Sequence, residues 1–200
     1  EDLKQIVSTM PDNEIRNILK KYTGLRKNRR HKPGRAFENS YYTFDILSDY
    51  GSFRDLQRHR LMTIEWQKMN PELGFNFPDE VKKTPYENEC KKLITKSKEL
   101  YEKLEASFPH LKEYALLFGH NIRYSMTMNI RQAFHLIELR TAKQGHISYR
   151  KVCMKMHDQI RDIAGHSNFY ELMSFTDHEE YELQRLDSEV KQAKKKENFN

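Results

Sequence analysis

Two stretches of this 200-residue chain alternate apolar and polar side chains, and this alternation constrains the fold more than any other feature. In Tyr41–Leu47, the side chains of Tyr42, Phe44 and Ile46 fall on one side. Ile122–Met128 repeats the pattern. A period of two residues is typical of β-strands, because successive side chains of a strand point to opposite faces. The sequence therefore predicts a small sheet.

Helical patterns fill most of the remaining chain, so the predicted class is α+β (α/β), a small sheet flanked by long helices. Pro85–Phe108 is the longest, and its apolar stripe is expected to be buried. Ser52 is the predicted cap of a helix running through Trp66, and Asn129 that of a helix to about Arg140. The stripe of the longest helix comprises Cys90, Leu93, Ile94, Tyr101, Leu104 and Phe108. The other predicted helices are Asp2–Met10, Asp12–Tyr22, Ser148–Ala164 and Phe169–Phe175.

The composition is that of one folded domain with a modest core, since 37% of the residues are hydrophobic and 12% are aromatic. No apolar run approaches the roughly 20 residues that span a bilayer, so a membrane is not an expected partner. Cys90 and Cys153 lie far apart in the sequence and are expected to be reduced thiols of a cytoplasmic protein. Charge dominates the last part of the chain, which predicts a charged helical tail over residues 177–200.

Two segments concentrate basic side chains. Arg54–Arg60 holds three arginines and a histidine, and Asn129–Arg140 adds two arginines, an asparagine and a histidine. Such density is costly to fold unless an anion lies between the groups, and the guanidinium fork binds phosphate bidentately. In a straight helix Arg60 would lie about 200° from Arg58. These two arginines therefore serve two partners or lie where the chain bends.

Each segment can also be explained by ordinary structural roles that involve no ligand. Arg54 and Arg58 could pair with surface acids, and a histidine such as His135 is more often structural than a ligand. Lys20–Arg35 holds eight Lys or Arg and no acid, which is typical of a solvated loop, of nucleic-acid attraction or of a cationic rim around a phosphate site. His157 and His166 are expected to be solvated surface histidines, and no metal site is predicted.

In order along the chain, these segments resemble the flavin-dependent thymidylate synthases, the ThyX family. Phe37-Glu38 leads through a strand to Arg58-His59-Arg60, as in the family's Arg-His-Arg motif. Further on, Thr127-Met-Asn129, Arg131 and Leu139-Arg140 match a strand ending in Thr-x-Asn and a helix Asn-x-Arg…Leu-Arg. The resemblance covers residues 12 to 175. It implies a ThyX-like domain over residues 1–176 that lacks the family's opening strand, with a mostly antiparallel sheet.

The resemblance implies methylation of dUMP to dTMP, with the methylene from methylenetetrahydrofolate and the hydride passed from NADPH through FAD. It also implies a homotetramer with sites between subunits, or pairing with another ThyX-like domain. The residues carried over as FAD-binding are Glu38, Arg58, His59, Arg60, Asn129, Arg131 and His135. Those carried over to the nucleotide substrate are Arg54, Lys68 and Arg140, and Arg140 would be catalytic by orienting the uracil.

The family pattern breaks mainly on the dUMP side. Lys68 stands where the family has Ser, Asp55 replaces a Gln, and Glu113 stands where an Arg is usual. Three hypotheses follow: a divergent working synthase with an altered dUMP site; a catalytically degenerate copy that binds FAD or scaffolds a partner, as half of a tandem protein; or a nucleic-acid-binding protein that uses the basic segment 20–35.

Overall fold

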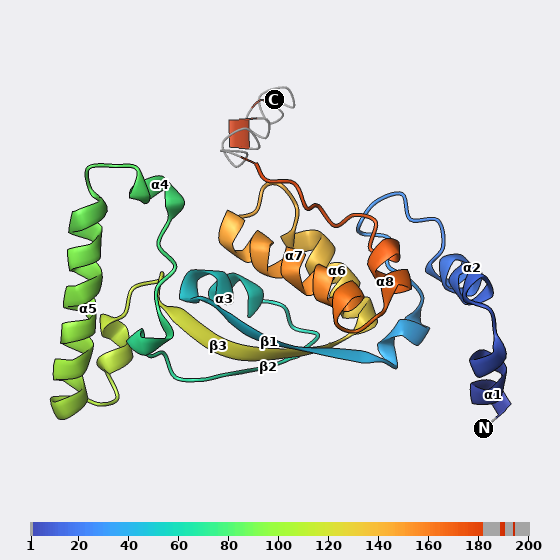
Figure 1. Cartoon of the computed structure of the whole chain (residues 1–200), viewed down its shortest axis with the longest axis horizontal. Helices are drawn as coiled ribbons and strands as arrows, with labels where there is room; N and C mark the ends of the chain where they lie inside the picture. Colours follow the sequence, from blue (N-terminus) through green and yellow to red (C-terminus); the bar gives the residue numbers. More distant parts are fainter. Residues whose placement is uncertain (1, 182–188, 191–193, 195–200) are drawn as a thin grey trace. The chain divides into compact units, whose positions relative to one another are not determined.

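The computed structural model describes residues 2–181, 189–190 and 194 (Figure 1). The chain forms two compact units. The first joins residues 1–42 to residues 128–200, and the second is Thr43–Thr127. Helices and a small sheet together confirm the predicted α+β class. Most of the predicted helical tail lies outside the described residues; of the part that is described, residues 177–181 are not helical, whereas residues 189–190 and 194 are.

The sheet has three strands in the order β1-β3-β2. β1 (Tyr41–Asp49) and β3 (Asn121–Asn129) confirm both predicted strands, each slightly longer than its alternating pattern. The third strand, β2 (Thr63–Trp66), pairs antiparallel with β3, with Thr63 opposite Thr127. Sequence analysis missed β2, because four residues carry too little alternation to distinguish a strand from a helix.

The predicted helix from Ser52 through Trp66 is wrong. α3 (Tyr50–Leu56) is capped by Asp49, whose carboxylate accepts from the backbone N–H of Ser52 at 2.8 Å, and it ends at Leu56. Its apolar face consists of Phe53 and Leu56, both buried. The next apolar side chain, Leu61, is 67% exposed, so no buried stripe continues the helix beyond this point.

The second unit also contains α4 (Asp79–Lys82), α5 (Glu87–Ser107) and the short 3₁₀ helices η2 (Pro71–Leu73) and η3 (Lys112–Ala115). α5 confirms the predicted long helix. It is fixed by Ser97, whose hydroxyl donates to the carbonyl of Ala115 at 2.6 Å, and by buried Tyr101. The prediction of a fully buried stripe is wrong, because Leu93 and Phe108 are 54% and 57% exposed.

In the first unit α6 (Ile130–Arg140) packs against α7 (Ile147–Asp162) and the 3₁₀ helix η1 (Arg35–Glu38), and α8 (Ser167–Leu172) packs against α7 (Figure 1). Asn129 caps α6, as predicted. α1 (Asp2–Thr9) and α2 (Asp12–Thr23) precede these elements and confirm the first two predicted helices. The fully buried side chains of α6 and α7 include Phe134, Leu136, Ile137, Cys153, Met156 and Ile160.

His157 is not the solvated surface histidine that the sequence suggested. Its side chain is buried, its ring stacks on Tyr170 with centroids 4.0 Å apart, and its Nε2 lies 2.9 Å from the Tyr170 carbonyl. Its Nδ1 lies 2.8 Å from Nε2 of His178. His166 is exposed as expected and bonds to the hydroxyl of Tyr42 at 2.8 Å.

Arg150 on α7 is a buried cation that binds the segment after α8. Its guanidinium donates to the carbonyls of Thr141 and Glu179 at 2.8 Å each, and lies 3.6 Å from the carboxylate of Asp177. The ring of Tyr181 lies 5.0 Å from the guanidinium carbon. Arg150, which is 1% exposed, therefore holds residues 177–181 to α7, together with His157, which contacts His178, and Lys151, which pairs with Glu180.

Both cysteines are free thiols, as expected, with Cys153 buried and Cys90 half-buried. Within the described part of the chain, none of the helices is both long and apolar enough to cross a lipid bilayer.

Candidate functional site

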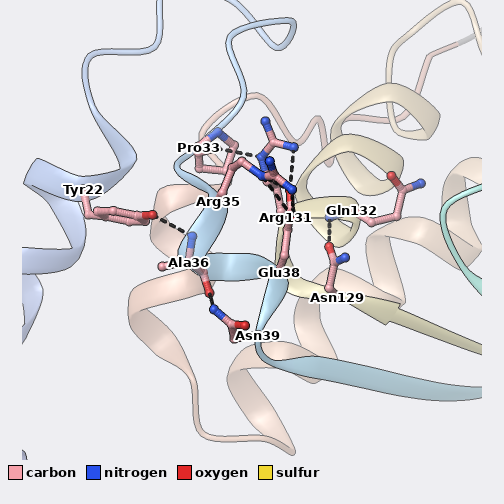
Figure 2. A network of polar contacts seen from close by, with 9 residues as sticks. All are labelled: Tyr22, Pro33, Arg35, Ala36, Glu38, Asn39, Asn129, Arg131 and Gln132. Atoms are coloured by element: carbon pink, nitrogen blue, oxygen red, sulfur yellow. Dashed lines mark hydrogen bonds and ion pairs between the residues drawn. The ribbon is translucent and has the colours of Figure 1, made fainter. Parts of the chain in front are cut away.

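Arg131 in the first turn of α6 is the centre of a polar network (Figure 2). Its Nη1 donates to the Glu38 carboxylate at 3.0 Å and its Nε to the carbonyl of Pro33 at 2.9 Å. Arg35 also donates to Glu38, at 3.1 Å. The hydrogen bonds from Arg35 hold the pKa of Glu38 below its ordinary value, and Arg131 adds to this effect. Glu38 is therefore ionised at neutral pH and orients Arg131.

Local packing fixes the η1 segment that carries Glu38. The Tyr22 hydroxyl accepts from the backbone N–H of Ala36 at 2.6 Å (Figure 2). The Tyr22 ring also lies edge-on to the ring of Phe37. A Cβ at Gly34 would come within 2.4 Å of the Tyr22 ring, so a residue without a side chain is needed for this close approach.

Asn129 and His135 lie on either side of Arg131 along α6. The Asn129 side-chain carbonyl accepts from the N–H of Gln132 at 2.8 Å, which commits this oxygen to the cap and leaves the NH₂ group as a donor. His135 is half-buried. Burial lowers the pKa of His135, and the neighbouring Lys32, Arg29 and Arg140 lower it further, so this imidazole is neutral at pH 7.

Arg140 ends α6, as predicted, and its guanidinium lies 5.3 Å from the centre of the Tyr149 ring. This stacking directs the side chain along the surface of α7. The structure thus brings together, within the first unit, four of the predicted FAD-binding residues and the predicted catalytic arginine. These are Glu38, Asn129, Arg131, His135 and Arg140.

The other predicted site residues belong to the second unit. Arg54 lies on α3, with its guanidinium 5.3 Å from the centre of the Phe118 ring. Arg58, His59 and Arg60 follow the end of α3 at Leu56, so Arg58 and Arg60 lie where the chain leaves the helix, which was one of the two alternatives. That the two basic segments converge on one ligand stays a prediction.

Arg58 and Arg60 differ from the other arginines of the site in their lack of protein partners. Both are exposed, and over residues 2–181, 189–190 and 194 neither forms an ion pair or a side-chain hydrogen bond. The structural explanation, in which Arg58 pairs with an acid on the surface, is therefore not supported. Two guanidiniums in a bend can bind an oxyanion without first breaking a salt bridge.

Lys68 and Glu113 are two of the positions at which the sequence was expected to depart from the family pattern. Lys68 is exposed just after β2, and the next residue, Met69, donates its backbone N–H to the Glu113 carboxylate at 3.0 Å. Glu113 therefore satisfies a backbone donor in the loop that carries Lys68. Its effect on a substrate phosphate stays a prediction.

Comparison with known families gives a clear match. A family model described as "Thymidylate synthase complementing protein" matches residues 4–165. The chain belongs to this family. Every predicted site residue falls inside the matched region.

Individual proteins are also similar to this member of the thymidylate synthase complementing protein family. A UPF0159 protein of Chlamydia muridarum is 36% identical over 188 residues, covering 94% of this chain and 35% of that protein. A UPF0159 protein of Thermoplasma acidophilum is 32% identical over 196 residues, covering 96% of this chain and 39% of that protein. The chain thus spans little more than a third of these relatives. A protein named flavin-dependent thymidylate synthase, from Thermococcus onnurineus, is 32% identical over 117 residues, covering 52% of this chain and 47% of that protein.

One structural element of this thymidylate synthase complementing protein domain was missed by sequence reasoning. Arg26 forms a buried ion pair with Glu138, with Nη1–Oε1 at 2.7 Å and Nη2–Oε2 at 2.5 Å. The Arg26 guanidinium also lies 5.3 Å from the Phe134 ring and 5.2 Å from the Phe175 ring. The available signal was Glu138 itself, an acid on the apolar face of α6 that requires a buried cation.

Proposed function

We propose that this chain is a FAD-dependent thymidylate synthase-like protein, a methyltransferase that converts dUMP to dTMP with methylenetetrahydrofolate and NADPH. The observation that carries the proposal is the family match over residues 4–165, which includes every residue assigned to the site. The dUMP side of this site is altered, with Lys68 in place of a hydroxyl residue and Asp55 and Glu113 as added acids.

The donor set of the proposed FAD site fits a dinucleotide that carries a pyrophosphate. The side chains of Arg58, Arg60, Arg131 and Asn129 all offer N–H donors, and the two exposed guanidiniums of the bend have no described partner to give up. The one acid of the set, Glu38, is already neutralised by Arg35 and Arg131. Binding therefore requires no uncompensated charge next to the phosphates.

When bound, FAD would supply the hydride for reduction of the transferred methylene. The residues of the chain would bind and orient. Glu38 would act through Arg131, which it holds in place, and neutral His135 would offer a hydrogen bond. Arg54 and Lys68 would contact the nucleotide, and Arg140 would place its guanidinium against the uracil carbonyls to stabilise the charge that develops when C6 is attacked.

We also propose that the protein is cytoplasmic and assembles as a homotetramer, or pairs with another domain of the family. The two free thiols support a reducing compartment. In a tetramer with shared sites, residues of the two basic segments could come from neighbouring subunits, which would account for their placement on different elements.

The main alternative is a catalytically degenerate copy that retains FAD and scaffolds a partner domain. Two observations favour it as the second candidate. Glu113 is fixed as an acid beside the Lys68 loop. In the Chlamydia muridarum relative the matched region is 35% of the protein, so there it is joined to further sequence.

The first experiment is purification of the chain and its double variant Arg58→Ala/Arg131→Ala, with bound flavin read from the visible absorbance spectrum. We expect yellow wild-type protein and a colourless variant that keeps the wild-type circular dichroism spectrum. The matched control is Arg16→Ala/Arg123→Ala, which removes two surface arginines paired with Glu171 and Asp45 and should keep its flavin. Flavin retained equally in both double variants would refute the assignment of the site.

Tritium release from deoxyuridylate labelled at C5 separates the two candidates. With NADPH and methylenetetrahydrofolate present, a working synthase releases tritium, and Arg140→Ala should abolish the release without removing flavin. Yellow protein that releases no tritium supports the degenerate copy.

A further inference from the structure

The basic segment between α2 and η1 is anchored to α6 at both of its ends. At one end Arg26 pairs with Glu138, and at the other Arg131 donates to the carbonyl of Pro33. Arg131, His135 and Glu138 stand at positions i, i+4 and i+7 of α6, so they share one face of the helix. Residues 26–33, here called the basic loop, therefore run along this face, over His135.

Internal hydrogen bonds give the basic loop a defined shape. Arg26 donates from Nε to the carbonyl of His31 at 2.5 Å while its other nitrogens bind Glu138. The side chain of Asn28 accepts from the N–H of Arg30 at 2.9 Å, and its carbonyl accepts from the N–H of His31 at 3.1 Å. The buried guanidinium of Arg26 thus fixes the shape of the loop, and the other four cations of the loop take no part in these hydrogen bonds through their side chains.

These remaining cations are Lys27, Arg29, Arg30 and Lys32. Within the described residues none of their side chains is paired with an acid, and Lys20–Arg35 contains no acid at all. Arg29 is half-buried, whereas the other three are exposed. A partly buried arginine without a described acidic partner can offer its guanidinium to an anion without first breaking an ion pair.

Two of the four cations, Arg29 and Lys32, lie near His135 of α6. Arg29 and Lys32 lie close enough to His135 to depress its pKa, and Arg140 contributes to the same positive field. Lys27 and Arg30 are both exposed. Lys32 directly precedes Pro33, whose carbonyl is bound by Arg131 one turn before His135 on α6, and Arg29 is the half-buried cation of the four. Arg29 and Lys32 are here called the inner pair, and Lys27 and Arg30, which carry the same total charge, the outer pair.

We propose that Arg29 and Lys32, held over His135 by the doubly anchored basic loop, bind the phosphate group of a nucleotide. A guanidinium and an ammonium offer a bidentate fork and a point charge to one phosphate, and the neutral His135 imidazole adds a hydrogen-bonding group without a competing negative charge. The inference deepens the proposed function, because it adds a phosphate subsite whose residues lie outside the set carried over from the family.

The test uses inorganic pyrophosphate as the probe and the purified full chain stripped of flavin, with binding measured by titration calorimetry. The Arg29→Ala/Lys32→Ala variant should bind pyrophosphate about 10–100-fold more weakly, because it loses two charge-assisted contacts. The matched control Lys27→Ala/Arg30→Ala removes the same charge from the same loop and should change the affinity by less than about threefold. Pyrophosphate should also shift the NMR resonances of the His135 imidazole in the wild type and in the control, but not in the inner-pair variant. The signals that disappear in His135→Gln identify these resonances.

Equal weakening in both double variants would overturn the proposal, since it would show a diffuse basic surface. That result together with oligonucleotide binding that falls steeply with salt would instead assign the loop to nucleic acid. If pyrophosphate binding follows the inner pair, competition identifies the source of the phosphate: FAD, dUMP, and NADPH compared with NADH are added in separate arms. A chain that holds no flavin but binds pyrophosphate through the inner pair would refute the proposed function and leave this inference standing.

Discussion

The Arg26–Glu138 ion pair should dominate the stability of the first unit, and Glu138→Gln tests this. The side chains of the pair are 5% and 0% exposed. Removing the carboxylate charge leaves a buried guanidinium with carbonyl oxygens and two aromatic rings but no counterion. Breaking a buried pair from one side costs about 3–5 kcal/mol, a large part of the roughly 5–15 kcal/mol that stabilises a typical domain.

Two further Arg–Glu pairs of the same unit provide graded controls. Arg131–Glu38 is 27% and 29% exposed, and Arg16–Glu171 is 52% on both sides. Glu171→Gln should cost about 0.2–1 kcal/mol, as exposed pairs do, and Glu38→Gln should fall between the two extremes. Because the three substitutions are chemically identical, burial is the variable that separates them.

The assay is urea unfolding followed by far-ultraviolet circular dichroism. With a slope of about 2 kcal/mol/M, a loss of about 3 kcal/mol lowers the midpoint for Glu138→Gln by about 1.5 M. Arg26→Met combined with Glu138→Leu should recover part of this loss, because no isolated charge remains. A Glu138→Gln midpoint no lower than that of Glu171→Gln would refute the argument from desolvation.

Three other predictions concern single side chains. Burial lowers the pKa of His157 to about 4, so this imidazole stays neutral in the folded protein, whereas in the unfolded chain it takes up a proton below its ordinary pKa of 6.5. The free energy of unfolding should therefore fall by up to about 3 kcal/mol as the pH is lowered from 6.5 towards 4. Denaturation midpoints of His157→Gln should fall less over the same pH range. Met126→Ala, at a position that is 0% exposed on β3, should cost about 2–5 kcal/mol in urea unfolding, whereas Leu47→Ala, at a position that is 55% exposed on β1, should change stability by less than about 0.5 kcal/mol; equal costs would contradict the burial assigned to β3. Burial raises the pKa of Cys153 to about 12, so iodoacetamide should label only Cys90 in the folded chain and both thiols in urea, as counted by mass spectrometry; rapid labelling of folded Cys153 would show that its site opens.

Local patterns were sufficient wherever an element presents one buried face. The alternation in β1 and β3 predicted both strands, and the Asn129 cap and its apolar face predicted α6 to within a residue. β2 was missed because its pairing with β3 is a contact between distant segments and leaves no local trace. The helix predicted through this region failed for the same reason, since a cap residue and good helix formers do not supply a partner surface.

The candidate site, too, could be predicted from the sequence only where the signal is local. Residues on α6 and in the Arg58–Arg60 bend were assigned to the site from motif order; the structure places them on a helix and after the end of one, and their roles stay predictions. The Arg26–Glu138 pair joins residues 112 positions apart, and nothing near Arg26 in the sequence distinguishes it from the other cations of its loop. The stripe of α5 was overestimated because periodicity shows which side chains share a face, while exposure depends on what covers them.

The buried guanidinium of Arg150 also determines where this chain can be shortened. A version that stops at residue 176 deletes the carbonyl of Glu179, the carboxylate of Asp177 and the ring of Tyr181 together, leaving a desolvated cation in the interior. A version that stops after residue 181 retains all three contacts. Expression trials of the two lengths should therefore differ in yield and melting temperature, although they differ by only five residues.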